Sequence, residues 1–262
     1  SNLSNVKDYS GYGNNGSNVS AVWNATGGYD NFGAYYFDGV DDVIFNSDAG
    51  LDFGAGDDYT ISVWISTRQN DTGRYILGLG NDGSSSGTYT LETSVSVGGN
   101  ISFAMRQGSV GDWFATASSV SISEDDWHYV VWVNDGSQVK TYIDGLLSKT
   151  DSLGSFVSHS LVDNYLRVGT TIWQNAYFNG SIDEVRIWDV ALSSEDVYQQ
   201  YVSNLNKFNS SQWYLYVNQS KNATDDLNYG GYTYQVFVED GSSNSNETDV
   251  RSVSLLDSSV EF

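Results

Sequence analysis

The chain has 262 residues and carries 33 acidic against 11 basic side chains, a formal net charge of −22 at pH 7. Such an acidic surface repels phosphate backbones and anionic lipid headgroups, which argues against nucleic acid and membrane surfaces as partners and leaves cations favourable. The chain has no cysteine, so disulfides and thiolate metal sites are excluded. The longest apolar run, residues 129–133, is far shorter than the ~20 residues that cross a bilayer, and we expect no membrane insertion.

The composition predicts a β-rich protein. Aromatic residues make up 15% of the chain and glycine contributes 27 residues, as in proteins built from strands and tight turns rather than in helical bundles. A hydrophobic content of 39% is enough for a packed core. The sequence begins without methionine and without a signal segment, which we interpret as a mature or excised piece of a protein.

Period-two alternation predicts short strands along most of the chain. In segment 59–66 the odd-numbered residues are apolar and most residues between them are polar, the pattern of a half-buried strand. Asn134-Asp135-Gly136 follows another such segment and favours a hairpin. The further predicted strands are 88–95, 101–106, 113–117, 127–133, 139–143, 165–168 and 181–188. Many short antiparallel strands indicate a sandwich or jelly roll.

One segment has helical character. In residues 191–201, Ser193 is followed three residues later by Asp196, which is a capping-box start. Val197 and Tyr201 lie four residues apart and share one face of a helix. We therefore expect one short helix packed against the sandwich.

After residue 205 the pattern changes to three alternating strands, 213–217, 232–238 and 250–255, separated by polar turns. We place a domain boundary there, with residues 1–205 as the sandwich and 206–262 as a small β module. Three strands alone bury little surface, so the tail is expected to share a core with the sandwich, with further sequence or with a neighbouring chain.

Six motifs follow one another in a fixed order: Asp8 to Gly16, Tyr36 to Asp42, Tyr59 to Ile65, Asp126 to Val131, Tyr142 to Gly145, and Asn179 to Trp188. Their order and spacing resemble laminin G-like, concanavalin A-like jelly-roll domains over residues 6–205. The tail resembles the C-terminal half of an immunoglobulin-like module, a pairing similar to that of archaeal cell-surface proteins. The expected fold is all-β: a concanavalin A-like jelly-roll β-sandwich with one short helix, followed by a small partial immunoglobulin-like β-sheet.

Calcium is the predicted cofactor, in a structural role. Asp8 and Asn14 lie in a Gly-rich loop that can supply the hard oxygen ligands that Ca²⁺ prefers. The resemblance implies that Asp183 closes this site from a distant strand, with Asp38 as a weaker candidate. The alternative is that these are ordinary turn residues, since Asp and Asn stabilise turns through side-chain hydrogen bonds.

Catalysis is not expected. Laminarinase-like members of this fold carry Glu-x-Asp-x-x-Glu along one strand, which places two carboxylates on the same face. Residues 124–126 and 247–249 begin this pattern, but Tyr129 and Ser252 stand where the closing Glu would be. The only histidines are His128 and His159, which leaves little material for a nucleophile–base pair.

Exposed aromatic and amide side chains are candidates for glycan binding. Trp173, Asn175 and Tyr177 lie together in a loop-like stretch, and Trp113 and Asn81 are further possibilities. The alternative is that most of these aromatic residues fill the sandwich core, so no ligand site is assigned.

The chain contains eleven Asn-x-Ser/Thr sequons, about twice what its composition predicts. We expect N-glycosylation and an extracellular location. The sequons are at Asn2, Asn15, Asn18, Asn24, Asn70, Asn100, Asn179, Asn209, Asn218, Asn222 and Asn246.

The leading hypothesis is a non-enzymatic extracellular cell-surface protein, calcium-stabilised and glycosylated, that serves as a structural subunit of a surface filament or coat, in adhesion, or in both. Its partners would be copies of itself or flanking domains of a longer chain, joined through open sheet edges. The polar first seven residues and the half-module tail favour this hypothesis. The alternative is a glycan- or protein-binding lectin-like module of a longer surface adhesin.

Overall fold

The computed structural model describes most of the chain, and every structural statement below concerns the described residues. These are residues 5–47, 50–51, 53, 56–68, 73–80, 89–107, 113–154, 156, 165–173, 176–207, 213–217, 230–235, 237–239 and 245–255. The chain divides into two compact units, Ser1–Tyr201 and Val202–Phe262.

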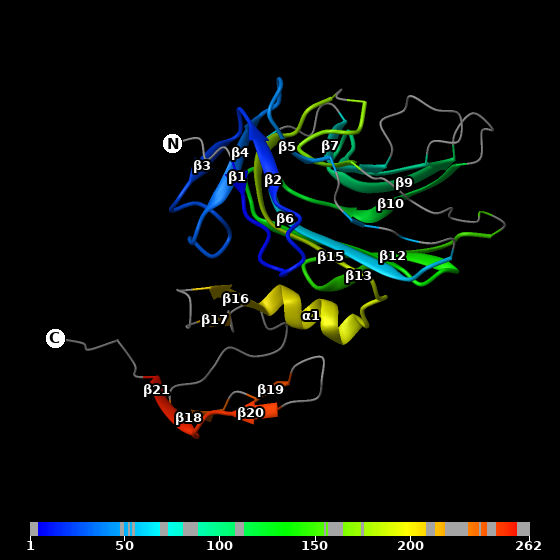
Figure 1. The fold of residues 1–262 in the computed structure, drawn as a ribbon. Coiled ribbons are helices and arrows are strands. Elements are labelled where there is room, and N and C mark those ends of the chain that lie inside the picture. The colour runs from blue at the N-terminus through cyan, green and yellow to red at the C-terminus, as the bar shows by residue number, and fades with distance from the viewer. Residues whose placement is uncertain are drawn as a thin grey trace. The chain divides into compact units, whose positions relative to one another are not determined.

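The first unit is a sandwich of two antiparallel sheets (Figure 1). In spatial order the eight-stranded sheet contains β1 (Asn5–Val6), β2 (Gly16–Val19), β5 (Val43–Asn46), β14 (Tyr165–Val168), β7 (Arg74–Gly80), β8 (Tyr89–Val95), β9 (Asn100–Gln107) and β10 (Trp113–Ser121). The seven-stranded sheet contains β13 (Leu146–Ser152), β12 (Gln138–Ile143), β11 (His128–Asn134), β6 (Tyr59–Thr67), β15 (Asn179–Trp188), β4 (Ala34–Asp38) and β3 (Val22–Asn24). The predicted jelly-roll sandwich is confirmed.

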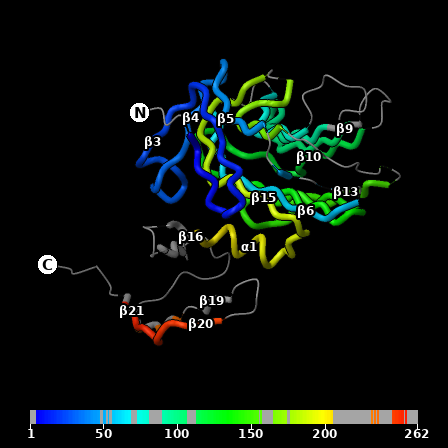
Figure 2. The backbone as a smooth tube through the Cα atoms, viewed as in Figure 1, coloured from blue at the N-terminus to red at the C-terminus, as the bar shows by residue number. Residues whose placement is uncertain are grey.

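Two strands from late in the unit lie in the middle of the sheets. β14 pairs with β5 and β7, and β15 pairs with β4 and β6. Figure 2 shows the same arrangement, with β15 beside the much earlier strand β4. Because β14 and β15 belong to different sheets, the connection between them, residues 169–178, crosses from one sheet to the other.

The main core lies between the two sheets. Its largest fully buried side chains include Trp132, Phe37 and Phe103. β6 was predicted to be half-buried, but both of its faces are buried, because Trp64 on the outer face packs against a second apolar cluster that contains Val197 of the helix.

The helix α1 (Ser194–Val202) covers that outer face of the seven-stranded sheet (Figure 1). Tyr201 stacks on Trp64 with ring centroids 5.6 Å apart. The Ser193 backbone N–H donates to Asp196 Oδ2 at 3.0 Å, and the Asp196 N–H donates to Ser193 Oγ at 3.2 Å. The predicted capping box and the single short helix are therefore confirmed among the described residues.

The second unit consists of three strand pairs. The pairs are β16 (Ser203–Lys207) with β17 (Trp213–Val217), β18 (Gly230–Tyr234) with β21 (Arg251–Leu255), and β19 (Phe237–Glu239) with β20 (Ser245–Glu247). The prediction of one continuous strand over 232–238 is wrong, because β18 ends at Tyr234 and β19 begins at Phe237. The immunoglobulin-like character of this unit stays a prediction. In the described part of the chain, no helix has the length and apolarity needed to cross a membrane.

Candidate functional site

The first polar site lies beside a β-bulge in β15. The pairing of β15 with β6 shifts register between Asp183 and Arg186, and Glu184 inside the bulge has φ of 48°. Ile182 stays in the core. Bulges redirect side chains and are frequent beside functional sites. Glu184 is held by Arg186, whose Nη2 donates to Glu184 Oε2 at 2.6 Å.

The Asp183 carboxylate is buried beside this bulge. Its Oδ1 accepts the Glu184 backbone N–H at 2.9 Å, whereas its Oδ2 is fully buried and has no hydrogen-bond partner. Burial, with the nearby charges of Glu184 and Asp30, raises the pKa of Asp183 to about 8. An unpartnered buried carboxylate oxygen is costly, so this position favours a bound cation or a proton.

Other oxygens converge on the same place. A Cβ atom at Gly28 would lie 2.6 Å from Asp183 Oδ2 and 2.8 Å from the Gly33 carbonyl oxygen. Asp30, between these glycines, is buried, and its Oδ1 accepts the Phe32 N–H at 2.9 Å. Carboxylate and carbonyl oxygens are the donors that Ca²⁺ selects. The loop 28–33 and Asp183 therefore fit the implied calcium ion.

The other predicted calcium ligands from the N-terminal region hold a turn. Asp8 Oδ1 accepts the Ser10 N–H at 2.8 Å, and Asp8 Oδ2 accepts the Asn14 N–H at 2.9 Å. Burial alone would raise the pKa of Asp8, but the hydrogen bonds from Ser10 and Asn14 lower it overall. Asp8 and Asn14 are thus brought together, but no hydrogen bond among the described residues joins them to Asp183.

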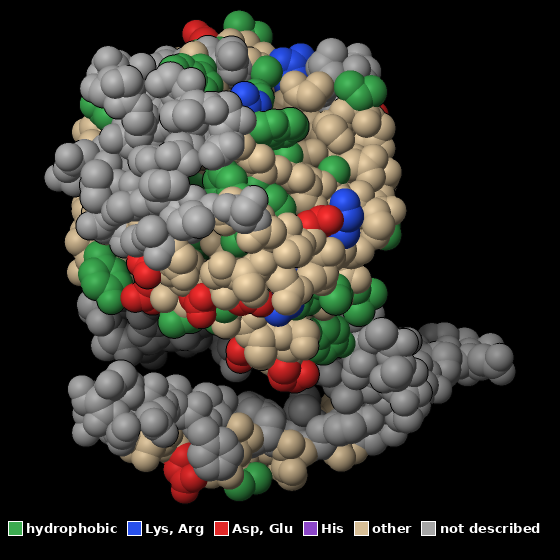
Figure 3. All heavy atoms as spheres, turned by 90° about the vertical axis from the view of Figure 1, so that its right-hand side faces the viewer, with side chains coloured by type: hydrophobic (Ala, Val, Ile, Leu, Met, Phe, Trp, Pro, Cys, Tyr) green, Lys and Arg blue, Asp and Glu red, His purple; other side chains and the backbone are tan. Residues whose placement is uncertain are grey.

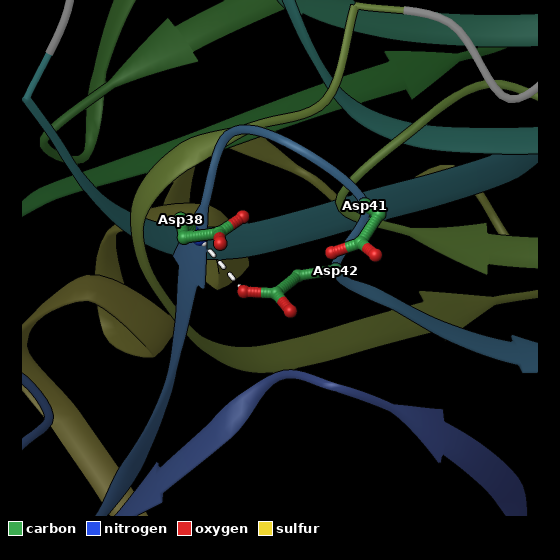
Figure 4. Close-up of side chains that lie close together, drawn as sticks. All are labelled: Asp38, Asp41 and Asp42. Carbon is green, nitrogen blue, oxygen red and sulfur yellow. Dashed lines mark hydrogen bonds between the residues drawn. The ribbon is translucent and has the colours of Figure 1, made fainter.

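Asp38 belongs to a separate acidic turn between β4 and β5. One oxygen each of Asp38, Asp41 and Asp42 lies within 4.8 Å of the others, and their carboxylates face one another (Figure 4). Asp42 Oδ2 accepts the Asp38 N–H at 2.8 Å, and Asp38 Oδ1 accepts the Val40 N–H at 2.8 Å. Burial raises the pKa of Asp42. The hydrogen bonds explain these side chains as turn residues.

A second polar site lies on the outer face of the eight-stranded sheet. Leu91 and Val95 of β8 point into the core, so Thr90 and Glu92, which alternate with Leu91, face outward. Glu92 is nevertheless only 3% exposed. Burial raises its pKa, and this is opposed by the charge of Arg106 and a hydrogen bond with the Trp173 side chain.

The pairing of β8, β9 and β10 decides which side chains lie next to Glu92 on this face. Arg106 of β9 lies between Thr90 of β8 and Trp113 of β10. Two residues further along the strands, Ala104 of β9 lies directly beside Glu92 of β8. A set of such directly paired residues across the strands is called a row below. Arg106 Nε is 3.6 Å from Glu92 Oε2, and the Arg106 side chain is 55% exposed. Trp113 is 65% exposed, so this row presents a cation and an indole to solvent.

The connection between β14 and β15 covers the other side of Glu92. A Cβ atom at Gly78 of β7 would lie 2.8 Å from the Ile172 backbone nitrogen, so the absence of a side chain there lets the connection approach the sheet. Arg167 Nη1 holds the connection by donating to the Ile172 carbonyl at 2.7 Å. Trp173 is thereby placed next to Glu92, and its side chain is 50% exposed.

Two of the five residues that the sequence singled out for glycan binding therefore lie on this face: Trp173 beside Glu92, and Trp113 beside Arg106. Tyr177 is partly buried, and its carbonyl accepts from Arg74 Nη1 at 3.3 Å. Asn81 and Asn175 lie outside the described residues. Sequence analysis missed Glu92, although its alternation with Leu91 places it on the outward face of the strand.

On the face drawn in Figure 3, acidic side chains gather in one part of the sandwich unit and basic side chains are scattered.

The sequence also gave no sign of a hydrogen-bonded array around His128. Its Nδ1 lies 2.8 Å from Asp144 Oδ2, and its Nε2 lies 2.9 Å from Ser123 Oγ. Ser123 Oγ also donates to Asp126 Oδ2 at 2.8 Å. The array ties the segment before β11 to the turn after β12. His159 lies outside the described residues.

Six of the sequons are described. Asn15, Asn24 and Asn246 are exposed. Asn18 Nδ2 donates to the Ala21 carbonyl at 2.8 Å, and Asn100 Nδ2 donates to the Ser118 carbonyl at 2.9 Å.

Asn179 is the sixth described sequon. It lies within β15, opposite Asp38 of β4, and its Oδ1 is fully buried. The remaining predicted glycosylation sites, Asn2, Asn70, Asn209, Asn218 and Asn222, lie outside the described residues.

The fold and these sites define a jelly-roll domain with an outward-facing polar and aromatic cluster on one sheet. The chain belongs to the concanavalin A-like lectin/glucanases superfamily, whose sequence pattern matches residues 37–198. The expected resemblance to laminin G-like, concanavalin A-like domains is confirmed, and the archaeal likeness stays a prediction. A search of curated proteins finds no match to the sequence.

Solved structures with the same fold include domain 4 of AbnA, a GH43 extracellular arabinanase from Geobacillus stearothermophilus, in complex with arabinotriose. It is 22% identical with a TM-score of 0.54, covering 69% of this chain and 81% of that one. The binding domain of Paraclostridial Mosquitocidal Protein 1 is 20% identical with a TM-score of 0.58, covering 77% and 51%. The Botulinum Neurotoxin serotype G binding domain is 15% identical with a TM-score of 0.56, covering 74% and 47%. This chain spans about half of each toxin domain, and the likeness establishes the fold.

Proposed function

We propose that the chain is a non-enzymatic, extracellular binding module that recognises a glycan through the outer face of strands β7–β10. The observation that carries the proposal is a polar and aromatic cluster, in which the exposed indole of Trp173 lies beside the buried Glu92 carboxylate and the exposed indole of Trp113 lies beside Arg106. Exposed indoles stack on sugar rings, and fixed polar groups orient hydroxyls. Two of the structural neighbours are binding domains, and a third forms a complex with arabinotriose, which supports the same class of function.

The absence of catalysis is part of this proposal. Glycoside hydrolysis normally needs two carboxyl groups about 5–10 Å apart. Among the described strand residues that face outward from β7–β10, Glu92 is the only carboxylate. A single carboxyl group on this face lacks the second carboxyl group that glycoside hydrolysis needs.

A glycan array probed with the native chain tests this function. We expect binding to a defined group of glycans, and loss of that binding in a Trp113→Ala, Trp173→Ala double variant that keeps the native circular dichroism spectrum. The matched control is Trp23→Phe, because Trp23 lies on β3 of the other sheet. Binding that survives in the double variant would contradict the proposed site, and an array without any bound glycan would contradict the function.

Structural calcium is a separate proposal. We place the ion at Asp183 with the loop 28–33, because these groups supply an unpartnered carboxylate oxygen and a converging carbonyl. Asp8, Asn14 and Asp38 stay predicted ligands. When bound, the ion would neutralise Asp183 and fix the loop to β15. A chelator should lower the melting temperature of the native chain but not that of Asp183→Asn, and an unchanged native melting temperature would contradict the proposal.

The surface-filament hypothesis also stays a proposal, together with N-glycosylation and a cell-surface location. N-glycosylation and a cell-surface location rest on the sequon excess, and the partners of a filament subunit would be copies of this chain or flanking domains. Negative-stain electron microscopy of native material tests it. Filaments or sheets would support a structural subunit, and discrete particles would contradict it while leaving the binding module intact.

A further inference from the structure

The Arg106 guanidinium is an open cationic group on an otherwise acidic protein. The Arg106 side chain makes no hydrogen bond to another described residue, and its ionic partner among them is Glu92, with Arg106 Nε 3.6 Å from Glu92 Oε2. An arginine that only neutralised a buried carboxylate would close on it in a two-bond fork at about 2.8 Å. The wider separation and the exposed side chain leave the guanidinium donors available to a ligand.

Glu92 fixes the position of this cation. Glu92 is buried, which raises its pKa; its Oε2 lies 3.6 Å from Arg106 Nε, and the Trp173 side chain is a polar neighbour that lowers this pKa. Its charge attracts Arg106, while burial beside Trp173 restricts the carboxylate itself. Glu92 is therefore a positioning residue, and its own carboxylate is already partnered before a ligand arrives.

The surroundings of Arg106 suit a sugar ring. Trp113, its direct cross-strand neighbour on β10, is mostly exposed and offers a stacking face. On the other side, Thr90 faces outward, is 4% exposed, and has a hydroxyl without a hydrogen-bond partner. In the adjacent row, Ala104 and Ala115 lie beside each other on β9 and β10, and these two described side chains are short.

We propose that the ligand is an acidic sugar, whose carboxylate binds the Arg106 guanidinium while its ring stacks on Trp113. This inference rests on the proposed glycan-binding function and names its ligand class. A guanidinium matches a carboxylate through two parallel N–H to oxygen bonds. A neutral glycan would leave these donors without an anionic partner in the bound state.

Matched sugar pairs test the inference by calorimetry on the full chain. The probes are trisaccharides of galacturonate, glucuronate and guluronate, each with its carboxyl-reduced, neutral form. We expect at least one uronate to bind ten times or more tightly than its reduced form. Equal binding of every pair, or binding to neither form, contradicts the acidic-ligand inference. The broad glycan array decides the binding function separately, because it includes neutral sugars.

Variants assign the preference to Arg106. Arg106→Gln should abolish the tenfold preference, and Arg106→Lys should retain only part of it, because an ammonium group lacks the planar fork. Arg68→Gln is the matched control, since Arg68 is similarly exposed and lies 3.8 Å from Asp125. A preference that survives in Arg106→Gln, or that is lost equally in Arg68→Gln, overturns the assignment.

Discussion

The Asp183 carboxylate and Gly28 face each other so closely that a Cβ atom at position 28 would lie 2.6 Å from Asp183 Oδ2. The same Cβ would lie 2.8 Å from the Gly33 carbonyl oxygen. Asp183 Oδ2 and the Gly33 carbonyl oxygen thus both lie close to Gly28, beside the bulge in β15. This contact links a loop near the start of the chain to a strand near the end of the sandwich.

Gly28→Ala should destabilise the sandwich more than backbone strain alone explains. Gly28 has φ of 88°, and a non-glycine residue in such a conformation costs about 1–3 kcal/mol. The clash with Asp183 and Gly33 adds to this cost. Gly11→Ala is the control, because Gly11 has φ of 94° and no atom within 4 Å of its Cβ position. Equal losses of unfolding free energy in urea would contradict the close approach.

Asp183 should make the stability of cation-free protein depend on pH. Its pKa is raised by burial from 3.8 to about 8, so between about pH 4 and pH 8 the folded state keeps a proton that the unfolded chain has lost. The free energy of unfolding contributed by this group therefore falls as pH rises through that window. Chemical unfolding at several pH values should show this slope in native protein.

The non-titrating variant Asp183→Asn isolates this contribution. Its unfolding free energy should change less steeply with pH, whereas Asp189→Asn, which alters an exposed carboxylate just after β15, should follow the native profile. An Asp183→Asn profile parallel to the native one would show that Asp183 ionises normally. Saturating calcium should reverse the native trend between pH 6 and pH 8, because only the ionised carboxylate binds the ion strongly.

Glycan occupancy should follow exposure. Among the described sequons, we expect sugars at Asn15, Asn24 and Asn246 and none at Asn100 and Asn179, whose side-chain amides are engaged or buried in the sheets. A sugar on the amide nitrogen needs open solvent around it. Glycopeptide mass spectrometry of native material measures each site. A fully occupied Asn179 would contradict the register of β15.

The array around His128 should be structural and not catalytic. The Ser123 hydroxyl donates to Asp126 Oδ2 and lies 2.9 Å from His128 Nε2, and we expect no covalent labelling by a fluorophosphonate probe. Ser123→Ala should lower the free energy of unfolding by about 1 kcal/mol, the typical net contribution of a hydrogen bond, with glycan binding unchanged. Labelling of native protein that is absent from Ser123→Ala would instead identify a nucleophile.

Local patterns predicted most of the strands of the main core and the helix. Alternation placed β6 and β14 closely, and the Ser193–Asp196 spacing placed the start of α1. These features depend on neighbouring residues, so a sequence pattern records them. Edge strands as short as β1 and β3 carry too few residues for a period to be read.

The candidate sites depend on contacts between distant segments and could be predicted only in part. The predicted strand over 88–95 contains Glu92, but its alternation does not show that this side chain is buried. Its burial involves Trp173, which arrives from the connection after β14. Asp183 was singled out by a family motif, yet its facing groups at Gly28 and Gly33 follow from the bulge in β15, which no local periodicity reveals.

The most direct test of the proposed binding face is a nuclear magnetic resonance titration of the indole N–H signals. The chain has eight tryptophans, which single Trp→Phe variants can assign, and the titrant is the tightest-binding sugar of the array. We predict that the signals of Trp113 and Trp173 shift with saturation, while those of Trp23, Trp64 and Trp132 stay in place. Saturable shifts confined to tryptophans away from the outer face of β7–β10 would contradict the account.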